Sequence, residues 1–343
     1  MGVAFKDLII SEEIKLDDLK NKVIILDAYN ILYQFLTTIR GMDGTPLKDS
    51  KGNITSHLVG LFSRTASLMQ KGIKPVFVFD GKPPELKQKV HEQRNVLKIE
   101  AEKKFLEAKE KMDIEEMKKY AARTSRLSKD MVEESKKLVS LLGIPSIQAP
   151  SEGEAQAAYM VKENKGFAVG SQDFDSLIHG AIKLVRNLSI TGRRKKGKTA
   201  AYETVKPELI DLSQNLNNLG IDHNQLIALA MIIGTDYNPG GIKGIGPKNA
   251  LKLVKQHKSD FDSLFREIKW DDFFDFGWTE VYYLIKKIPT TDDYELGWKN
   301  VDDEAIFKML VDEHDFSMER VKSTLEKLKK ESAEKQQKSL GDF

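Results

Sequence analysis

Short apolar runs alternate with longer amphipathic stretches along most of the chain, and this pattern predicts strands that alternate with helices. Runs bounded by turn residues, as expected of buried strands, occur at 22–26, 75–79, 144–147, 167–170, 182–185 and 188–190. Helical patterns occur at 29–39, 55–71, 85–143, 206–219, 223–234, 248–257 and 302–331. Such alternation is typical of the α/β class, so we predict a central, mainly parallel twisted sheet with helices on both faces.

Composition permits one large domain and excludes several kinds of site. The 343 residues are 40% hydrophobic, which is enough for a large core. No apolar run approaches the ~18 residues of a membrane-spanning helix, so we expect none. The chain contains no cysteine, which excludes disulfides, thiolate zinc sites and cysteine nucleophiles.

The net charge of +2 indicates little about a partner, but the charges are unevenly distributed. Basic residues outnumber acidic ones over 82–130, and the basic segment 193–198 contains no acid. Four positions at helical spacing in the first stretch form one row of potential cations: Lys87, His91, Arg94 and Lys98. Taken alone, a solvated helix face is the simpler explanation of this row.

Carboxylates recur where the expected strands end. Asp27 and Asp80 each follow an apolar run, and the carboxyl ends of parallel strands are where sites form in open sheets. The candidate acids are Asp27, Asp80, Glu152, Glu154, Asp173, Asp175 and Asp236. Each has an ordinary explanation when taken alone. Ser151 with Glu154 matches a capping box, and an Asp after a strand often forms a turn.

Together, the seven acids indicate a metal site. Carboxylates that converge within a few ångström repel one another, so some must become protonated or a cation must bind. Oxygen ligands without cysteine or a His-rich motif favour Mg²⁺ or Mn²⁺ over zinc. Two such ions suit phosphodiester hydrolysis, because one activates water and both stabilise the attacking and leaving oxygens.

Several motifs, in order along nearly the whole chain, resemble those of the flap endonucleases, a family of structure-specific 5′ nucleases. They are Phe79–Pro84 (FDGKPP), Ser151–Ala157 (SEGEAQA), Ser171–Asp175 (SQDFD), Thr55–Leu58 followed by Gly60–Arg64, and the turn Gly241–Gly246 (GIKGIG). The short tail, without a long basic extension, is closer to the archaeal members than to the eukaryotic ones.

The resemblance implies a single nuclease domain over 1–331, with a helical arch over the active site and a helix–hairpin–helix region that binds DNA. Its parts are expected at about 1–110 (N-terminal nuclease region), 82–130 (arch), 122–258 (internal nuclease region), 238–258 (helix–hairpin–helix) and 259–331 (helical C-terminal part). A flexible tail with a clamp-binding peptide is expected over 332–343.

The same resemblance places the seven acids at the family's metal-binding positions and implies two Mg²⁺ ions, with Mn²⁺ as a substitute. The expected ligands of one ion are Asp27, Asp80, Glu152 and Glu154, and those of the other are Asp173, Asp175 and Asp236.

Catalytic roles for three further residues also follow from the resemblance. Lys87 and Arg94 match arch residues that reach the scissile phosphate, where cations neutralise developing charge. Tyr33 matches an aromatic residue on which a base near the cut stacks. The alternative for Tyr33 is an ordinary core position on an amphipathic helix.

The expected DNA contacts are Gly2, Arg40, Arg64, Gly234, Gly241, Lys243, Gly244, Gly246, Lys248, Arg193 and Arg194. Glycines in the turn let the backbone approach phosphate, and the N-terminus of the following helix attracts anions. The family's turn also implies a monovalent cation. A plain helix connector is the alternative explanation of this turn.

Gln337, Leu340 and Phe343 resemble a peptide that binds the sliding clamp (PCNA), although the second aromatic of the family's pattern has no counterpart here. The expected partners are therefore flapped or otherwise branched DNA and this clamp, with no membrane. We expect a monomer, located in the cytoplasm with the nucleoid if the source is archaeal and in the nucleus if it is eukaryotic.

The resulting functional prediction is a 5′ flap endonuclease with 5′–3′ exonuclease activity, acting in Okazaki-fragment maturation and base-excision repair. Three alternatives stay open: another nuclease of the superfamily, a non-catalytic junction-binding protein, and a metal phosphatase with Asp27 as nucleophile. The absence of long insertions argues against the first, and the full set of acids argues against the second. The third would need a second acid where Tyr29 stands.

Overall fold

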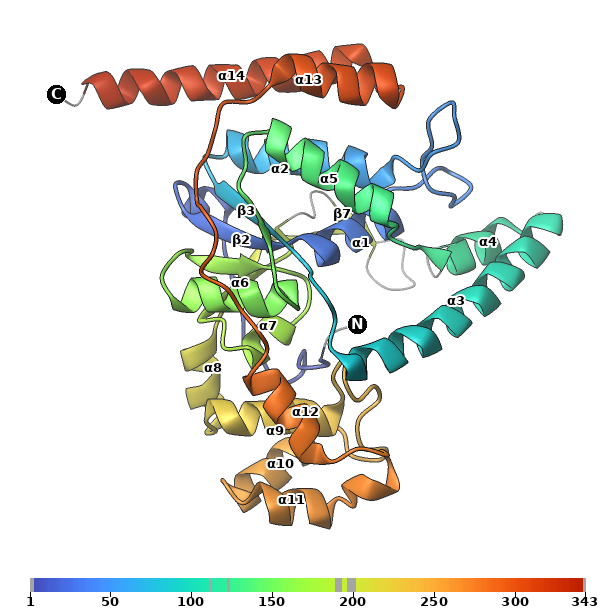
Figure 1. The fold of residues 1–343 in the computed structure, drawn as a ribbon, viewed down its shortest axis with the longest axis vertical. Helices are drawn as coiled ribbons and strands as arrows, with labels where there is room; N and C mark the ends of the chain where they lie inside the picture. Colours follow the sequence, from blue (N-terminus) through green and yellow to red (C-terminus); the bar gives the residue numbers. More distant parts are fainter. Residues whose placement is uncertain (1–2, 112, 122–123, 189–192, 196–201, 342–343) are drawn as a thin grey trace.

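One sheet organises the molecule (Figure 1). The computed structural model describes residues 3–111, 113–121, 124–188, 193–195 and 202–341. The sheet order is β1-β9-β6-β5-β2-β3-β4. Its strands are β1 (Glu12–Glu13), β2 (Val23–Asp27), β3 (Lys74–Phe79), β4 (Ser146–Gln148), β5 (Ala168–Gly170), β6 (Lys183–Arg186) and β9 (Glu208–Asp211). The neighbouring pairs from β6 to β4 are parallel, whereas β9 pairs antiparallel with β6 and β1, so the predicted mainly parallel sheet is confirmed.

Side chains of the central strands alternate between two hydrophobic cores. Ile24 and Leu26 of β2 pack into one core with Phe77 of β3, whereas Ile25 and Val76 pack into the other. Because both faces of these strands are buried, the strands are continuous apolar runs. This is why their positions were evident in the sequence.

Helices cover both faces of the sheet (Figure 1). One face carries α6 (Gly153–Lys162) and α7 (Asp175–Ile178). The other face carries α1 (Ala28–Thr38), α2 (Ser56–Gln70) and α5 (Lys129–Leu141), with α13 (Asp303–Phe307) and α14 (Met318–Gly341) outside them. The short 3₁₀ helix η1 (Leu16–Leu19) precedes β2.

A helical lobe lies beyond α7, at the bottom of Figure 1. It consists of α8 (Leu212–Leu219), α9 (His223–Ile233), α10 (Pro247–His257), α11 (Phe261–Glu267), the 3₁₀ helix η3 (Trp270–Asp272) and α12 (Trp278–Lys286). An extended segment over 287–302 then returns past the sheet to α13. It is held there by paired hydrogen bonds of 2.8 Å between the Gln156 side-chain amide and the Thr291 backbone.

Two helices project from the body as an arm, α3 (Glu85–Glu110) and α4 (Ile114–Ala121) (Figure 1). The arm leaves the sheet after β3 and returns at α5, which corresponds to the predicted arch. The helical stretch expected over 85–143 is divided among α3, α4 and α5. Asp113 accepts a hydrogen bond from Glu116 N (3.0 Å) and Ser128 accepts one from Met131 N (3.2 Å), and these caps begin new helices.

Other boundaries also differ from the sequence predictions. The helix expected over 206–219 begins as strand β9, which takes this form through its pairing with β6. The basic segment contributes β7 (Arg193–Lys195), which pairs with β8 (Tyr202–Thr204) in a separate two-stranded sheet. The strand expected at 188–190 lies mostly outside the described residues. The helix expected over 302–331 is divided into α13, the π-helical turn η4 (Lys308–Glu313) and α14.

The tail also differs from its prediction. We expected a flexible segment from residue 332, but α14 continues through Gly341. Lys, Glu, Gln and Ala dominate this stretch, and all of them favour the helix. Within the part of the chain that the structure covers, no helix has both the length and the apolar character required to cross a membrane.

Candidate active site

Asp27 and Asp80 lie at the carboxyl ends of the neighbouring parallel strands β2 and β3. Asp27 Oδ1 accepts a hydrogen bond from Asn30 N at 3.1 Å, so this carboxylate caps α1 while it faces the strand ends. Asp80 Oδ1 accepts one from Gly153 N at 2.7 Å. A Cβ at position 153 would lie 2.6 Å from that oxygen, so glycine permits α6 to begin this close to Asp80.

The N-terminus of α6 brings two glutamates to the same place. Glu152 is the N-cap residue and is 3% exposed, but its side chain makes no capping hydrogen bond. Ser151 Oγ donates to Lys82 O at 3.2 Å rather than capping the helix. The capping-box explanation of Ser151 and Glu154 is therefore wrong, and another role is needed for both glutamates.

Asp173 and Asp175 follow β5 and are held by residues distant in the sequence. Asn30 Nδ2 donates to Asp173 Oδ2 at 2.8 Å, and Asn30 Oδ1 accepts from Gln172 N at 3.0 Å. Val3 N donates to Asp175 Oδ1 at 2.7 Å, so the N-terminal segment closes this end of the site. Sequence reasoning missed Asn30, and a polar residue three positions after Asp27 was its only signal.

The pKa values of the carboxylates show how closely the acids lie. Burial, followed by the charge of Asp80, raises the pKa of Asp27 to about 8. Burial, followed by Glu152, raises the pKa of Asp80 to about 6. Burial, followed by Asp236, raises the pKa of Asp175 to about 7. Charges from β2, β3, α6, α7 and the turn after α9 thus act on one another across a single site.

Glu154 completes this group. Burial, followed by the charge of Asp175, raises the pKa of Glu154 well above its ordinary value, and Asp27 adds to this effect. Asp173 also raises the pKa of both Asp27 and Asp175. All seven acids that the sequence singled out are therefore brought together.

Lys87, in the first turn of α3, is the cation at the centre of the cluster. Its ammonium donates to Glu152 Oε2 and lies 3.6 Å from Asp236 Oδ2, and the residue is 8% exposed. Burial lowers the pKa of Lys87, but Glu154, Glu152 and the other carboxylates raise it more, so the ammonium form is favoured. Lys87, which was predicted to contact the scissile phosphate, thus contacts two of the predicted metal ligands, Glu152 and Asp236.

The donor set fits hard divalent cations. Every candidate ligand is a carboxylate, and Mg²⁺ and Mn²⁺ prefer oxygen ligands. As the side chains lie here, no three His, Asp or Glu residues in the described ranges are spaced to hold a metal ion. The negative charge is instead offset by Lys87 and by the raised carboxyl pKa values. These residues would therefore have to change position before they could surround a cation.

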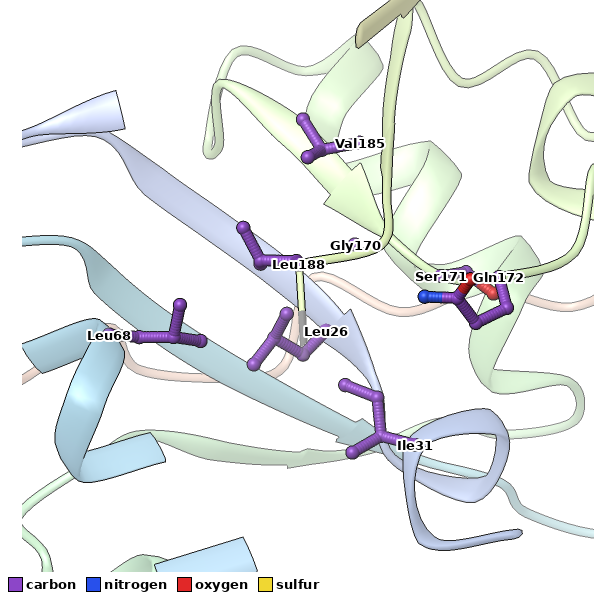
Figure 2. Close-up of a pocket in the computed structure, with 8 residues that line it drawn as sticks. All are labelled: Leu26, Ile31, Leu68, Gly170, Ser171, Gln172, Val185 and Leu188. Carbon is purple, nitrogen blue, oxygen red and sulfur yellow. The ribbon is translucent and has the colours of Figure 1, made fainter. Parts of the chain in front are cut away.

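The nearby hollow in Figure 2 is not a substrate site. Its volume is about 10 Å³, about the space of one water molecule. Aliphatic side chains of β2, α1, α2 and β6, including Leu26, Ile31 and Leu68, line it behind the strand ends. It is a packing defect in the core.

Helices α1 and α3 carry two further predicted residues. Tyr33 is 37% exposed, and the ammonium of Lys98 lies 5.4 Å from its ring centroid. An exposed aromatic face, rather than a core tyrosine, is therefore present on α1. Arg94 belongs to α3 and follows Lys87 by seven positions, about two turns along the same row, but its side chain lies outside the described atoms.

Arg40 and Arg64 differ in how far they are available for DNA. The Arg40 guanidinium donates to Thr37 O (3.2 Å), Gly44 O (2.8 Å) and Ser125 Oγ, so it holds the base of the arch. Arg64 lies half-buried on α2, and burial lowers its pKa. The Arg40 guanidinium already donates hydrogen bonds within the protein, so it would have to give up some of them to make its predicted DNA contact.

The predicted helix–hairpin–helix turn lies between α9 and α10. Gly234, Gly241 and Gly244 have φ values of 114°, 55° and 88°. Gly246 is the N-cap residue of α10, with Pro247 in the first turn. The remaining predicted contacts, Lys243 and Lys248, are exposed beside this turn. Backbone and ammonium groups are therefore presented together on one surface.

Several predicted contacts cannot be placed as side chains. Arg193 and Arg194 belong to β7, and Gln337 and Leu340 belong to α14, but their side chains lie outside the described atoms. Gly2 and Phe343 lie outside the described residues altogether. Their roles stay predictions.

Sequence reasoning missed two buried polar groups at the cluster. His179 Nε2 lies 4.0 Å from Glu154 Oε1, and burial lowers the pKa of His179 to about 3. The Tyr237 hydroxyl is also buried, next to Asp236 in the sequence. His179 sits in an apolar stretch and Tyr237 in a turn, and neither setting signalled that the side chain lies close to the acids.

Comparisons with known proteins agree with this geometry. Residues 2–101 match the XPG N-terminal domain and residues 143–236 match the XPG I-region. A flap endonuclease 1 from Thermococcus onnurineus (strain NA1) is 53% identical over 334 residues, covering 96% of this chain and 95% of the relative. One from Pyrococcus furiosus is 52% identical over 334 residues, with the same shares covered.

Solved structures extend the likeness to three dimensions. The flap endonuclease-1 from Methanococcus jannaschii superposes with a TM-score of 0.75 at 46% identity, covering 97% of this chain and 100% of that one. The catalytic core of Rad2 in complex with DNA substrate has a TM-score of 0.69 at 24% identity, covering 96% and 100%. The second likeness shows a shared fold.

Proposed function

Because this chain belongs to the flap endonuclease family, we propose that it is a structure-specific nuclease that cuts branched DNA near the base of 5′ flaps. The observation that carries this proposal is the convergence of seven carboxylates and Lys87 where the arch begins. A cluster of this charge suits a phosphodiester substrate only when divalent cations intervene.

The proposed cofactors are two Mg²⁺ ions, with Mn²⁺ as a substitute. When bound, they would supply an activated water and positive charge at the attacking and leaving oxygens. Asp27, Asp80, Glu152 and Glu154 would hold one ion, and Asp173, Asp175 and Asp236 the other. The raised carboxyl pKa values support this, because a cation would relieve the repulsion that raises them.

The chain's own residues would bind and orient DNA around this centre. Lys87 and Arg94 would approach the scissile phosphate from α3 and offset charge that develops there. Tyr33 would stack on a base, which suits recognition of shape rather than sequence. The glycine turn and Lys243 would hold the duplex backbone, together with a monovalent cation.

Partners and cellular role form a further part of the proposal. We propose 5′–3′ exonuclease activity beside flap cutting, and a role in Okazaki-fragment maturation and base-excision repair. The C-terminal residues Gln337, Leu340 and Phe343 would bind the sliding clamp. The relatives named above are archaeal, which supports action in a cytoplasm where the nucleoid lies.

The test is cleavage of a 5′-end-labelled double-flap DNA, with Mg²⁺ or with EDTA, beside a single strand and an intact duplex. A single product near the flap base, formed only with Mg²⁺, is the expected result. Binding without cutting would replace the proposal with a junction-binding protein. Stepwise release of mononucleotides without flap incision would replace it with an exonuclease.

A further inference from the structure

The turn that carries Asp236 is held rigidly by buried hydrogen bonds. Asn238 Oδ1 accepts from Thr235 Oγ1 at 2.6 Å, and Asn238 Nδ2 donates to Met231 O at 2.6 Å. Gly234 begins the turn with φ 114°, and an added Cβ there would lie 2.7 Å from Gly241 N. Tyr237 N donates to Thr235 Oγ1 at 3.1 Å. The backbone of Tyr237 is therefore fixed in one place.

The side chain of Tyr237 is buried directly after the predicted metal ligand Asp236. It is 3% exposed, and its hydroxyl is buried without a hydrogen-bond partner among the described residues. After burial, the charges of Glu152, Glu154, Asp236 and Asp175 raise the pKa of Tyr237, so four of the seven acids act on this phenol, although none accepts a hydrogen bond from it. The hydroxyl is thus a neutral, unpartnered donor on which the charges of four carboxylates act.

A buried donor that lacks a partner costs stability, whereas a phenylalanine ring would fill the same core position without that cost. Carboxylates that ligate metals use one oxygen for the ion and are held by hydrogen bonds to the other. A phenol can donate such a bond and leave the negative charge of the carboxylate in place. The Lys87 ammonium, by contrast, offsets that charge.

We propose that Tyr237 is a positioning residue whose hydroxyl donates to the outer oxygen of a metal-binding carboxylate and so turns its inner oxygen toward the divalent ion. This inference rests on the proposed two-metal nuclease function. The rigid turn would make the donor ready before the metal arrives, which is how supporting residues raise affinity.

The test compares Tyr237→Phe with the matched control Tyr294→Phe. The Tyr294 hydroxyl is also buried without a partner in the described part of the chain. Its charged neighbours are Asp292 and Glu163, which lie outside the cluster. Mn²⁺ binding to the full-length protein without DNA would be measured by electron paramagnetic resonance. Thermal unfolding would be measured in EDTA and in Mn²⁺.

We expect Tyr237→Phe to weaken Mn²⁺ binding by about tenfold. Its Tm in EDTA should be unchanged or higher, because no hydrogen bond is lost there, while the rise in Tm with Mn²⁺ should shrink. Cleavage by this variant should need more Mg²⁺, with an unchanged KM for DNA. Tyr294→Phe should bind Mn²⁺ as the wild type does.

Two results would overturn the inference. Mn²⁺ affinity equal to the wild type would show that the hydroxyl does not position a ligand, and a lower Tm in EDTA with unchanged metal response would show a purely structural role. With either result, the proposed function still stands provided that the wild type cuts flaps and binds Mn²⁺. A wild-type protein that neither binds Mn²⁺ nor cuts would overturn both.

Discussion

At the scale of single residues, charge balance dominates this protein. The carboxylates at the strand ends are buried or half-buried and repel one another, and the buried ammonium of Lys87 opposes their charge. Repulsion of this kind is unfavourable for folding and favourable for binding cations. The residues that weaken the fold here are therefore the ones on which the proposed activity depends.

Asp173→Asn should abolish cleavage while leaving junction binding largely intact. The substitution removes a charge from the proposed metal site but keeps a side chain that can hydrogen-bond to Asn30. Single-turnover cleavage and a gel-shift assay on the same flap DNA measure the two properties. Wild-type cleavage by the variant would contradict the assignment of the metal ligands.

Lys87→Ala and Arg94→Ala should each slow single-turnover cleavage by about 100-fold or more, with a smaller effect on binding, because they remove charge that stabilises the transition state. Lys103→Ala is the matched control, since Lys103 is exposed further along α3. Equal cleavage rates for the wild type and all three variants would show that the basic row of α3 is an ordinary solvated helix face.

The stability of the metal-free protein should fall as pH rises from about 4 to 8. The pKa values of Asp80, Asp175 and Asp27 are raised to about 6, 7 and 8 in the folded protein, from an unfolded value of 3.8. The folded state therefore binds more protons than the unfolded state across this range, so deprotonation disfavours folding. Thermal unfolding in EDTA at several pH values measures the effect.

Divalent metal should reverse this trend, because bound cations favour the ionised carboxylates and release their protons. The same unfolding series in Mg²⁺ is the comparison. A Tm in EDTA that rises steadily between pH 5 and 8 would contradict the proposed clustering of protonated acids.

At the scale of elements, a polar cluster joins the loop after α1 to the C-terminal helices. His314 Nδ1 lies 3.2 Å from Asp49 Oδ2, and Glu134 of α5 lies between His314 Nε2 (3.6 Å) and His57 Nε2 of α2 (3.0 Å). Asp49 also accepts hydrogen bonds from Asn53 N and Lys51 N. One aspartate thus organises a loop and fixes the C-terminal segment against it.

Asp49→Ala should lower Tm, because it leaves several donors of the loop without their acceptor. Burial raises the pKa of Asp49, but hydrogen bonds from Asn53 and His314 have the larger combined effect and lower the pKa to about 2. Its contribution is therefore present above pH 3.8 and is lost as pH falls toward 2. Thermal unfolding at pH 7 and at low pH measures both effects.

The control for this prediction is Asp17→Ala, which removes an exposed ion pair with Lys71. Exposed pairs contribute little to stability, so Tm should hardly change. Equal Tm values for the two variants would show that the polar cluster does not hold the loop.

At the scale of the whole molecule, separate parts meet around one site. The sheet supplies acids, the arch supplies Lys87, and the lobe of α9 and α10 supplies Asp236 and the glycine turn. The extended segment over 287–302 connects this lobe with the layer of α13 and α14 (Figure 1). In the proposed function, DNA would contact several of these parts while cleavage takes place at the carboxylate cluster.

Deleting residues 337–343 should weaken stimulation by a sliding clamp without changing intrinsic cleavage. Of the proposed peptide, Gln337 and Leu340 lie near the C-terminal end of α14, away from the strand ends. Flap cleavage with and without the clamp measures both properties. Clamp stimulation that is unaffected by the deletion would leave this segment without a role in binding.

The sequence by itself determined the fold class and the chemical identity of the site. Strands buried on both faces are apolar runs, and acids at their ends are visible because they interrupt those runs. The seven carboxylates, the basic row of α3 and the glycine turn were therefore predicted from local pattern or from the family motifs that contain them.

Only the tertiary structure decided which side chains meet. Asn30 and Asp173, or Lys87 and Glu152, are distant in the sequence, and no periodicity relates them. Strands β1 and β9 exist through pairing across the sheet edge rather than through their own patterns. In the sequence, nothing distinguishes Tyr237 from other aromatic residues, whereas the structure buries its hydroxyl without a partner where the charges of four carboxylates act on it. Local propensity selects elements, whereas burial and charge act on neighbours in space.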